Sequence, residues 1–195
     1  IAEATIREDQ RWGTIGNHAY HIAELKTWLQ ERIYWLNTNL NNFQACANPD
    51  VPNLVISKIH YHPKSDQGFS KDDLEFIEIT NHSSATVDLT GVYIQEPGIG
   101  FSFAPYSAVS AGQKIYLASN ASVFEQYYGF APFDQYSRTL SNKSYKIRLS
   151  DAWGNVIDEV HYMDSNPWPP QADGDGPYLQ LINLDLDNSL PQSWT

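Results

Sequence analysis

Cysteine is almost absent from this sequence of 195 residues, which contains only Cys46. A single cysteine excludes an internal disulfide and any zinc site built on several cysteines. Basic residues are also scarce: 12 Lys and Arg stand against 23 Asp and Glu, for a formal net charge of -11. Because nucleic-acid and anionic-membrane binders need a basic surface, we expect neither partner. No apolar run approaches the roughly 18 residues of a transmembrane helix, so we expect no membrane insertion.

The sequence holds enough apolar residues for a packed core. Hydrophobic residues make up 42% and aromatic residues 13% of the chain, which argues against global disorder and favours β structure. The chain starts at Ile1 and shows no signal peptide, so we interpret it as a piece cut from a longer protein. We expect a helical segment at 1–45, a proline-containing linker at 46–53 and a β domain at 54–195.

The first segment carries a helical period. Apolar residues recur at steps of three and four, and neither glycine nor proline interrupts residues 18–40. This pattern predicts one helix over 18–39, with Asn17 as its N-cap. Because an isolated helix cannot bury so much apolar surface, we expect the stripe to be covered. The stripe comprises Ile22, Leu25, Leu29, Ile33, Leu36 and Leu40.

From Leu54 onward the hydrophobic period changes to two, which is typical of strands. Short apolar runs separated by turn residues predict an all-β fold, an antiparallel sandwich with one core, and one or two helical turns are expected at 122–128. The predicted strands cover 54–61, 75–80, 87–94 with a bend near Gly91, 101–103, 114–118, 145–149, 156–162 and 178–182. The expected core includes Ile77, Ile79, Leu89, Leu117, Ile147, Val160 and Leu181. In the second strand, Glu78 and Thr80 are expected on a partly exposed face.

The succession of strands and turns resembles the lamin tail domain, in a bacterial form. The resemblance implies an immunoglobulin-like antiparallel β-sandwich over 54–195, preceded by the N-terminal helical segment, and an interaction fold without catalytic residues. The matching pieces lie at 56–63, 75–81, 87–92, 101–103, 149–151, 156–162, 168–170 and 172–181, and include Trp168-Pro-Pro170 and Asp173-Gly-Asp-Gly176.

Residues 1–45 resemble the last helices of the CotH kinase-like family of spore-coat proteins. The resemblance rests on Arg11-Trp12-Gly13 followed by Trp28-Leu29 and Trp35-Leu36. It implies a bacterial parent protein that is secreted or held at the cell surface or in the periplasm. None of that family's nucleotide- or metal-binding motifs lies in this fragment, so no catalytic residue can be assigned. We expect no enzymatic activity and no cofactor.

His60 and His62 are the first candidate metal ligands. At positions i and i+2 of a predicted strand they share one face, a spacing that suits zinc or copper. Glu75, Glu78 or His82 would complete the ligand set. Two histidines without a third fixed ligand are a common accident, so we favour a strand edge with two polar side chains and expect no metal.

Asp173 and Asp175 begin an acidic stretch that continues with Asp185 and Asp187. Carboxylates this close repel one another unless a hard cation lies between them, so a weak calcium site is one interpretation. The spacing does not match an EF-hand loop. We favour a glycine-rich turn before the last strand.

Aromatic residues gather between the fifth and sixth predicted strands. Such a group is able to stack on sugar rings or on a peptide if it is exposed. Alternatively, a long connection packs its own aromatics as a small core, which is the interpretation we favour. The residues are Tyr127, Tyr128, Phe130, Phe133 and Tyr136.

Together these patterns favour a non-catalytic interaction or tethering module of a larger protein. Its partner would be a protein or a cell-envelope glycan. A carbohydrate-binding module that uses the loop aromatics is the first alternative. The second alternative is a fragment of an enzyme. Its catalytic core would lie upstream, because no nucleophile–base signature appears in 54–195.

Overall fold

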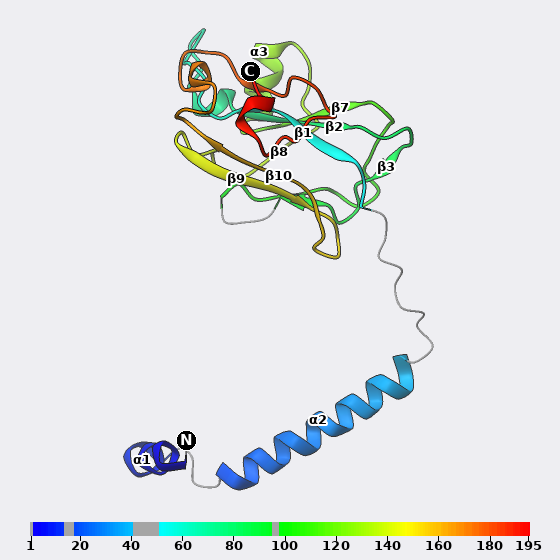
Figure 1. The fold of residues 1–195 in the computed structure, drawn as a ribbon, viewed down its shortest axis with the longest axis vertical. Coiled ribbons are helices and arrows are strands. Elements are labelled where there is room, and N and C mark those ends of the chain that lie inside the picture. The colour runs from blue at the N-terminus through cyan, green and yellow to red at the C-terminus, as the bar shows by residue number, and fades with distance from the viewer. Residues whose placement is uncertain (1, 14–17, 41–50, 95–97) are drawn as a thin grey trace. The chain divides into compact units, whose positions relative to one another are not determined.

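The chain forms two compact units, Ile1–Pro49 and Asp50–Thr195. Both are drawn in Figure 1, a ribbon view of the computed structural model. The structure describes residues 2–13, 18–40, 51–94 and 98–195.

The first unit contains helix α1 (Ala2–Trp12) and helix α2 (His18–Leu40). Helix α2 confirms the helix predicted over 18–39, whereas the sequence pattern does not indicate α1. The expected N-cap, Asn17, and the lone Cys46 lie outside the described residues. None of the helices in the described ranges has both the length and the apolar character that spanning a membrane requires.

Within its own unit, most of the described part of the apolar stripe of α2 is exposed, so the cover that the sequence predicts for it does not come from α1. Leu25, Leu29 and Ile33 have 52%, 44% and 55% of their surface exposed. Trp28 on the same helix is exposed as well. The described part of this unit offers only α1 for packing, and an 11-residue helix cannot cover such a stripe.

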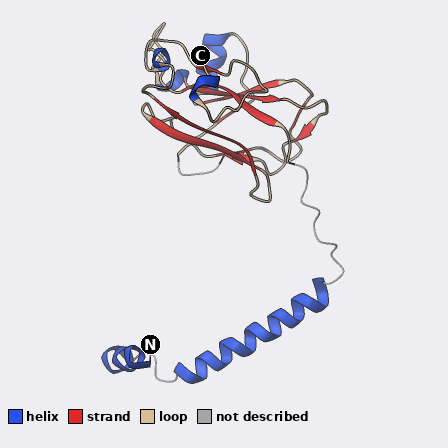
Figure 2. Cartoon of the chain, in the orientation of Figure 1, coloured by secondary structure: helices blue, strands red, loops and turns tan. Residues whose placement is uncertain are grey.

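The second unit consists mostly of strands, drawn in red in Figure 2. Its strands are β1 (Leu54–His60), β2 (Phe76–Asn81), β3 (Val87–Asp88), β4 (Tyr93–Ile94), β5 (Phe101–Ser102), β6 (Ala108–Val109), β7 (Lys114–Ala118), β8 (Asp134–Gln135), β9 (Ser144–Ser150), β10 (Val156–Met163) and β11 (Leu179–Gln180). Its helices are α3 (Ala121–Tyr128) and the 3-10 helices η1 (Asp72–Leu74), η2 (Pro170–Ala172) and η3 (Pro191–Ser193).

The strands form two facing sheets, which confirms the predicted all-β sandwich. The larger sheet has the order β11-β1-β2-β7-β8, and the smaller has the order β10-β9-β4-β5. A separate pair joins β3 to β6. In Figure 1 the layer with β9 and β10 lies below the layer with β1, β2 and β7, while α3 lies above both.

One hydrophobic core fills the space between the sheets, as predicted. Inward residues alternate along the long strands, as a period of two requires. Trp168 is buried and packs against Trp194 with ring centroids 6.0 Å apart. Every predicted core residue is confirmed as a buried member of this cluster: Ile77, Ile79, Leu89, Leu117, Ile147, Val160 and Leu181.

The third predicted run, 87–94, bends near Gly91 as expected. It divides into β3, which pairs with β6, and β4, which pairs with β5 and β9. The chain turns between them at Gly91, which has a φ of +77°. A Cβ there would lie 2.7 Å from the Cβ of Ala152, so glycine is needed both for the turn and for the close approach.

Two short strands, β6 and β8, are absent from the prediction. Strand β8 runs parallel to β7, whereas the sequence predicts antiparallel pairing throughout. Both strands have two residues, which is too short for a hydrophobic period to be visible.

Strand β2 differs from the partly exposed strand that we expected. All six of its residues are buried, including Glu78 and Thr80 on the side away from the core. Helix α3 covers part of that side, and its Phe124 packs on Phe76 with ring centroids 5.7 Å apart. The buried polar residues therefore require hydrogen-bond partners within the sheet.

Asp158 of β10 accepts a hydrogen bond from a part of β1 that does not pair with the neighbouring strand β11. Strand β11 pairs only with Lys58 and Ile59. Asp158 Oδ2 accepts hydrogen bonds from the Ile56 N–H at 2.6 Å and from Asn188 Nδ2 at 2.7 Å. Burial raises the pKa of Asp158, although these bonds oppose the change. A strand edge that is hydrogen-bonded in this way offers fewer unpaired backbone N–H and C=O groups to a strand of another protein.

Candidate binding site beside helix α3

Helix α3 confirms the helical turns predicted at 122–128. The Asn120 side chain caps its N-terminus by accepting a hydrogen bond from the Val123 N–H at 3.2 Å. Gly129 ends it in the left-handed region, with a φ of +81°. Two ends fixed in this way hold the helix, and the tyrosines in its last turn, at a defined place over the sheet.

A second, smaller hydrophobic cluster anchors α3 to the outer side of the larger sheet. Ring contacts dominate it, and T-shaped or tilted aromatic pairs stabilise such a layer beyond the area that they bury. We call it the α3 cluster. It consists of buried Phe76, Ala118 and Phe124, with Tyr116, Tyr128 and Tyr178 packed against them.

His60, at the end of β1, is buried beside the α3 cluster. Its Nε2 lies 3.1 Å from the Gly176 carbonyl oxygen, and its Nδ1 lies 3.2 Å from the Tyr128 hydroxyl. Because a carbonyl oxygen only accepts, Nε2 carries the proton and Nδ1 accepts from Tyr128. Burial lowers the pKa of His60 to about 4, despite the Gly176 contact. The imidazole is therefore neutral at physiological pH.

Tyr127 ties the loop after β1 to α3. Its hydroxyl donates to Asp66 Oδ2 at 2.8 Å, and this hydrogen bond raises the pKa of Tyr127. The other carboxylate oxygen of Asp66 accepts from the Gln67 N–H at 2.9 Å. Phe69, three residues along the loop, meets the Tyr127 ring edge-on at 6.1 Å.

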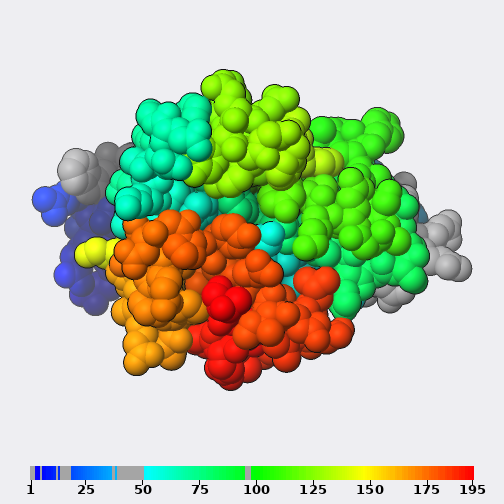
Figure 3. Space-filling model, turned by 90° about the horizontal axis from the view of Figure 1, so that it is seen from above, coloured from blue at the N-terminus to red at the C-terminus, as the bar shows by residue number. Residues whose placement is uncertain are grey.

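A pocket of about 220 Å³ lies between this loop and α3. The segments that form it adjoin on the face shown in Figure 3: teal near residue 65, yellow-green for α3 and orange near residue 175. Its lining combines two tyrosines with charged, polar and apolar groups. The lining residues are His60, Pro63, Lys64, Ser65, Asp66, Leu74, Tyr127, Tyr128 and Gly176.

The sandwich unit also matches a known family. The family model described as Lamin Tail Domain matches residues 47–164, more than half of the 195-residue chain. The chain belongs to the lamin tail domain family. Lamin tail domains are immunoglobulin-like, are generally non-catalytic and often serve as protein-interaction modules. No curated protein matches the sequence.

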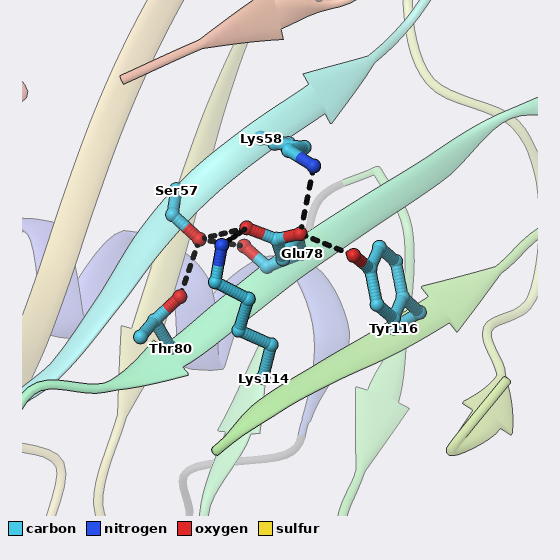
Figure 4. Close-up of polar contacts among 6 residues, drawn as sticks. All are labelled: Ser57, Lys58, Glu78, Thr80, Lys114 and Tyr116. Carbon is cyan, nitrogen blue, oxygen red and sulfur yellow. Dashed lines mark hydrogen bonds and ion pairs between the residues drawn. The ribbon is translucent and has the colours of Figure 1, made fainter. Parts of the chain in front are cut away.

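On the same outer side of this lamin tail domain, Glu78 is surrounded by donors (Figure 4). Ser57 Oγ donates to Oε1 at 2.8 Å, and the Tyr116 hydroxyl donates to Oε2. Lys58 Nζ lies 3.1 Å and Lys114 Nζ 3.4 Å from the carboxylate oxygens. Burial alone would raise the pKa of Glu78, but these hydrogen bonds and charges lower it below its ordinary value. Glu78 is thus a buried anion with a complete set of partners.

Glu75 is the second buried glutamate, and it lacks such cations. Its Oε2 accepts from the Leu140 N–H at 2.8 Å and from the Tyr136 hydroxyl at 3.4 Å. Burial raises the pKa of Glu75 to about 8, although both hydrogen bonds oppose the change. Glu75 therefore holds its proton at neutral pH and joins β2 to the 136–140 segment.

The structure does not bring the two candidate histidines onto one strand face, because β1 ends at His60. His62 Nδ1 instead lies 2.6 Å from Asp173 Oδ1, and Lys71 Nζ lies 3.4 Å from His62 Nε2. The positive charge of the Lys71 ammonium would repel a cation bound to the His62 imidazole. Within the described ranges, no three His, Cys, Asp or Glu side chains gather as a metal site would require.

The proposed completing ligands each have other partners. Glu75 and Glu78 lie in the separate networks described above, and His82 Nε2 lies 2.8 Å from Asp185 Oδ1. In the acidic stretch, Asp187 accepts from the Ser189 hydroxyl at 2.6 Å, and Asp175 is exposed. Three carboxylates of this stretch, those of Asp173, Asp185 and Asp187, therefore bind neighbouring protein groups.

The predicted aromatic group divides among four environments. Tyr127 and Tyr128 line the pocket. Phe130 packs on Phe124 at 5.2 Å, and Phe133 contacts Phe103 at 5.6 Å. Tyr136 is 2% exposed and belongs to the main core, so this residue follows the favoured interpretation of packed aromatics and does not belong to a binding surface. Its hydroxyl reaches Glu75, which explains why this tyrosine turns inward.

Several lining residues of the pocket were not recognised in the sequence. Lys64, Ser65 and Asp66 lie in the loop that follows β1, and Gly176 lies over one hundred residues further along. The available signal was the Pro63-Lys-Ser-Asp66 run, which reads as an ordinary turn. Only the fold brings it against Tyr127.

Proposed function

We propose that this chain is a non-catalytic interaction module that connects a neighbouring domain to a binding partner. The observation that carries the proposal is the state of its buried titratable groups. His60, Glu75 and Glu78 each lie in hydrogen bonds that hold the sandwich together. A general acid or base needs a group that is free to exchange a proton with a substrate. Glu75 and Glu78 serve the fold, and both ring nitrogens of His60 already have protein partners.

The test is an assay of the chain for ATP hydrolysis, phosphotransfer, and glycoside and ester hydrolysis. We expect no turnover above the buffer control. Turnover that a single carboxylate or histidine substitution within 54–195 abolishes would show the domain to be an enzyme. A Glu125→Gln chain, altered at an exposed position of α3, is the matched control for substitutions at buried glutamates.

We further propose that the helical unit is the end of a CotH kinase-like domain in a bacterial extracytoplasmic protein. Two observations support this: the resemblance carried by Trp28 and Trp35, and the exposed stripe of α2. A helix from the edge of a larger domain would expose such a stripe when that domain is removed. The test is the sequence of the complete gene. We expect a kinase-like domain and a secretion signal upstream, and any other upstream fold contradicts the proposal.

A glycan is the partner class that the site itself favours. The pocket beside α3 combines tyrosine rings with hydrogen-bonding side chains, which is the combination that sugar rings need. This carbohydrate-binding role is compatible with a tethering function at a cell envelope. Glycan binding is measured by presenting the chain to an array of neutral glycans. The Ser65→Trp chain, presented to the same array, is the negative control.

A further inference from the structure

The size of the pocket limits what it accepts. Pockets for drug-sized ligands have volumes of about 300–1,000 Å³, whereas this one measures about 220 Å³. It therefore has room for a single ring or one side chain. Pro63 and Leu74 contribute apolar surface, and Tyr127 and Tyr128 contribute aromatic surface.

The charges of the lining cancel. Lys64 supplies one positive charge and Asp66 one negative charge, while the buried His60 is neutral near pH 7. A charged ligand would gain one contact and meet one repulsion, so the lining favours a neutral ligand. The side chains of Lys64, Ser65 and Asp66 together offer both donors and acceptors.

The site is also held in shape without a ligand. The Tyr127–Asp66 hydrogen bond joins the loop to α3, and His60 joins the Gly176 segment to Tyr128. A preorganised site loses less entropy on binding than a loose one. A neutral ring matches this arrangement if it has an apolar face and hydroxyl groups. The apolar face packs on the tyrosines, and the hydroxyls meet the polar side chains of the loop at 64–66.

We propose that the pocket between α3 and the loop at 63–66 binds one neutral pyranose ring of a glycan. The inference rests on the proposed binding function and assigns its site and ligand class. One ring face packs against Tyr127 or Tyr128. The ring hydroxyls donate to the Asp66 carboxylate and accept from Lys64 or Ser65, in place of water.

The test is an NMR titration of the full chain with methyl glucoside, methyl galactoside and N-acetylglucosamine, each added separately. For one ring in a small site we expect a Kd of about 1–10 mM for at least one sugar. The amide signals that move should be those of residues 64–66, 127–128 and 176. No saturable shift at these amides with any of the three sugars overturns the inference.

Two variants test the site itself. Ser65→Trp fills the pocket from an exposed loop, and Asp66→Asn removes the charged acceptor. Each substitution should weaken sugar binding at least about tenfold. Ser84→Trp, at an exposed loop serine outside the pocket lining, is the matched control and should leave the Kd unchanged. Equal affinity in the Ser65→Trp and control chains contradicts the assignment.

The outcomes separate this inference from the proposed function. Sugar binding that moves amides elsewhere overturns the pocket assignment but leaves a binding module. Shifts at the pocket with a lysine-rich peptide, and none with sugars, overturn the ligand class in favour of a protein side chain. Catalytic turnover in the assays above overturns the proposed function, whatever the pocket binds.

Discussion

Glu75 Oε2 accepts a hydrogen bond from the Leu140 N–H at 2.8 Å and so joins two segments 65 residues apart inside the sandwich. Burial raises the pKa of Glu75 to about 8 from an ordinary value of 4.5. Between these pH values the native state holds a proton that the unfolded chain has lost. The contribution of Glu75 to the free energy of unfolding therefore falls as pH rises from 4.5 to 8, by at most about 1.4 kcal/mol per pH unit.

Glu75→Gln should remove this dependence, because glutamine keeps an acceptor for Leu140 and cannot ionise. We expect the variant to be more stable than the native chain above pH 8. Urea unfolding at several pH values measures how the free energy of unfolding depends on pH in the native chain and in the variant. Glu125→Gln at an exposed site should retain the native slope. Parallel curves for native and Glu75→Gln chains would show that Glu75 is not protonated in the fold.

His60 produces the opposite dependence on the acid side. Burial lowers the pKa of His60 from 6.5 to about 4, so between these values the unfolded chain binds a proton that the native state does not. Stability is fully present above pH 6.5 and is lost as pH falls toward 4. An NMR titration of the ring signals should give a midpoint near 4. A midpoint near 6.5 would contradict the burial of this ring.

The partners of Glu78 should differ in their contribution to stability. Glu78→Ala leaves the Tyr116 hydroxyl without its acceptor and the Lys58 ammonium, whose side chain is 16% exposed, without its counter-charge. It should cost about 3–5 kcal/mol. Lys114→Met should cost less than about 1 kcal/mol, because the Lys114 side chain is 51% exposed and solvent screens its charge. Urea midpoints measure both changes. An equal loss from the two substitutions would contradict this ranking.

The core should tolerate truncation far less than the surface does. Ile147→Ala removes a side chain that is 0% exposed and should cost about 2–5 kcal/mol. Ile182→Ala makes the same chemical change at a residue that is 59% exposed and should cost less than about 0.5 kcal/mol. Calorimetry or urea unfolding compares them. Similar losses at both positions would place Ile147 outside the core.

The sandwich should fold without the helical segment. Contacts divide the chain into Ile1–Pro49 and Asp50–Thr195, and the hydrophobic core lies wholly within the second unit. Deletion of residues 1–45 should therefore leave one cooperative unfolding transition. Loss of cooperativity in the shortened chain would show that α1 or α2 contributes to the core.

Local periodicity in the sequence determined the long elements of this protein. Helix α2 follows from apolar steps of three and four, and β2 and β9 follow from alternation, because one buried face imposes one repeat. The inward positions of Ile77, Ile147 and Leu117 follow from the same rule. Strands of two residues, such as β6 and β8, contain no full repeat, and their positions depend on pairing with distant strands.

Only the tertiary structure decided which polar residues are buried and which meet at the pocket. Glu78 sits on the face that alternation assigns to solvent, yet Tyr116 and two lysines enclose it. The pocket joins Asp66 to Tyr127, and His60 to Gly176, across 61 and 116 residues of chain. Burial, hydrogen bonding and pKa depend on neighbours in space. Such neighbours are set by the packing of whole sheets, whereas the hydrophobic period records only which face of each element is apolar.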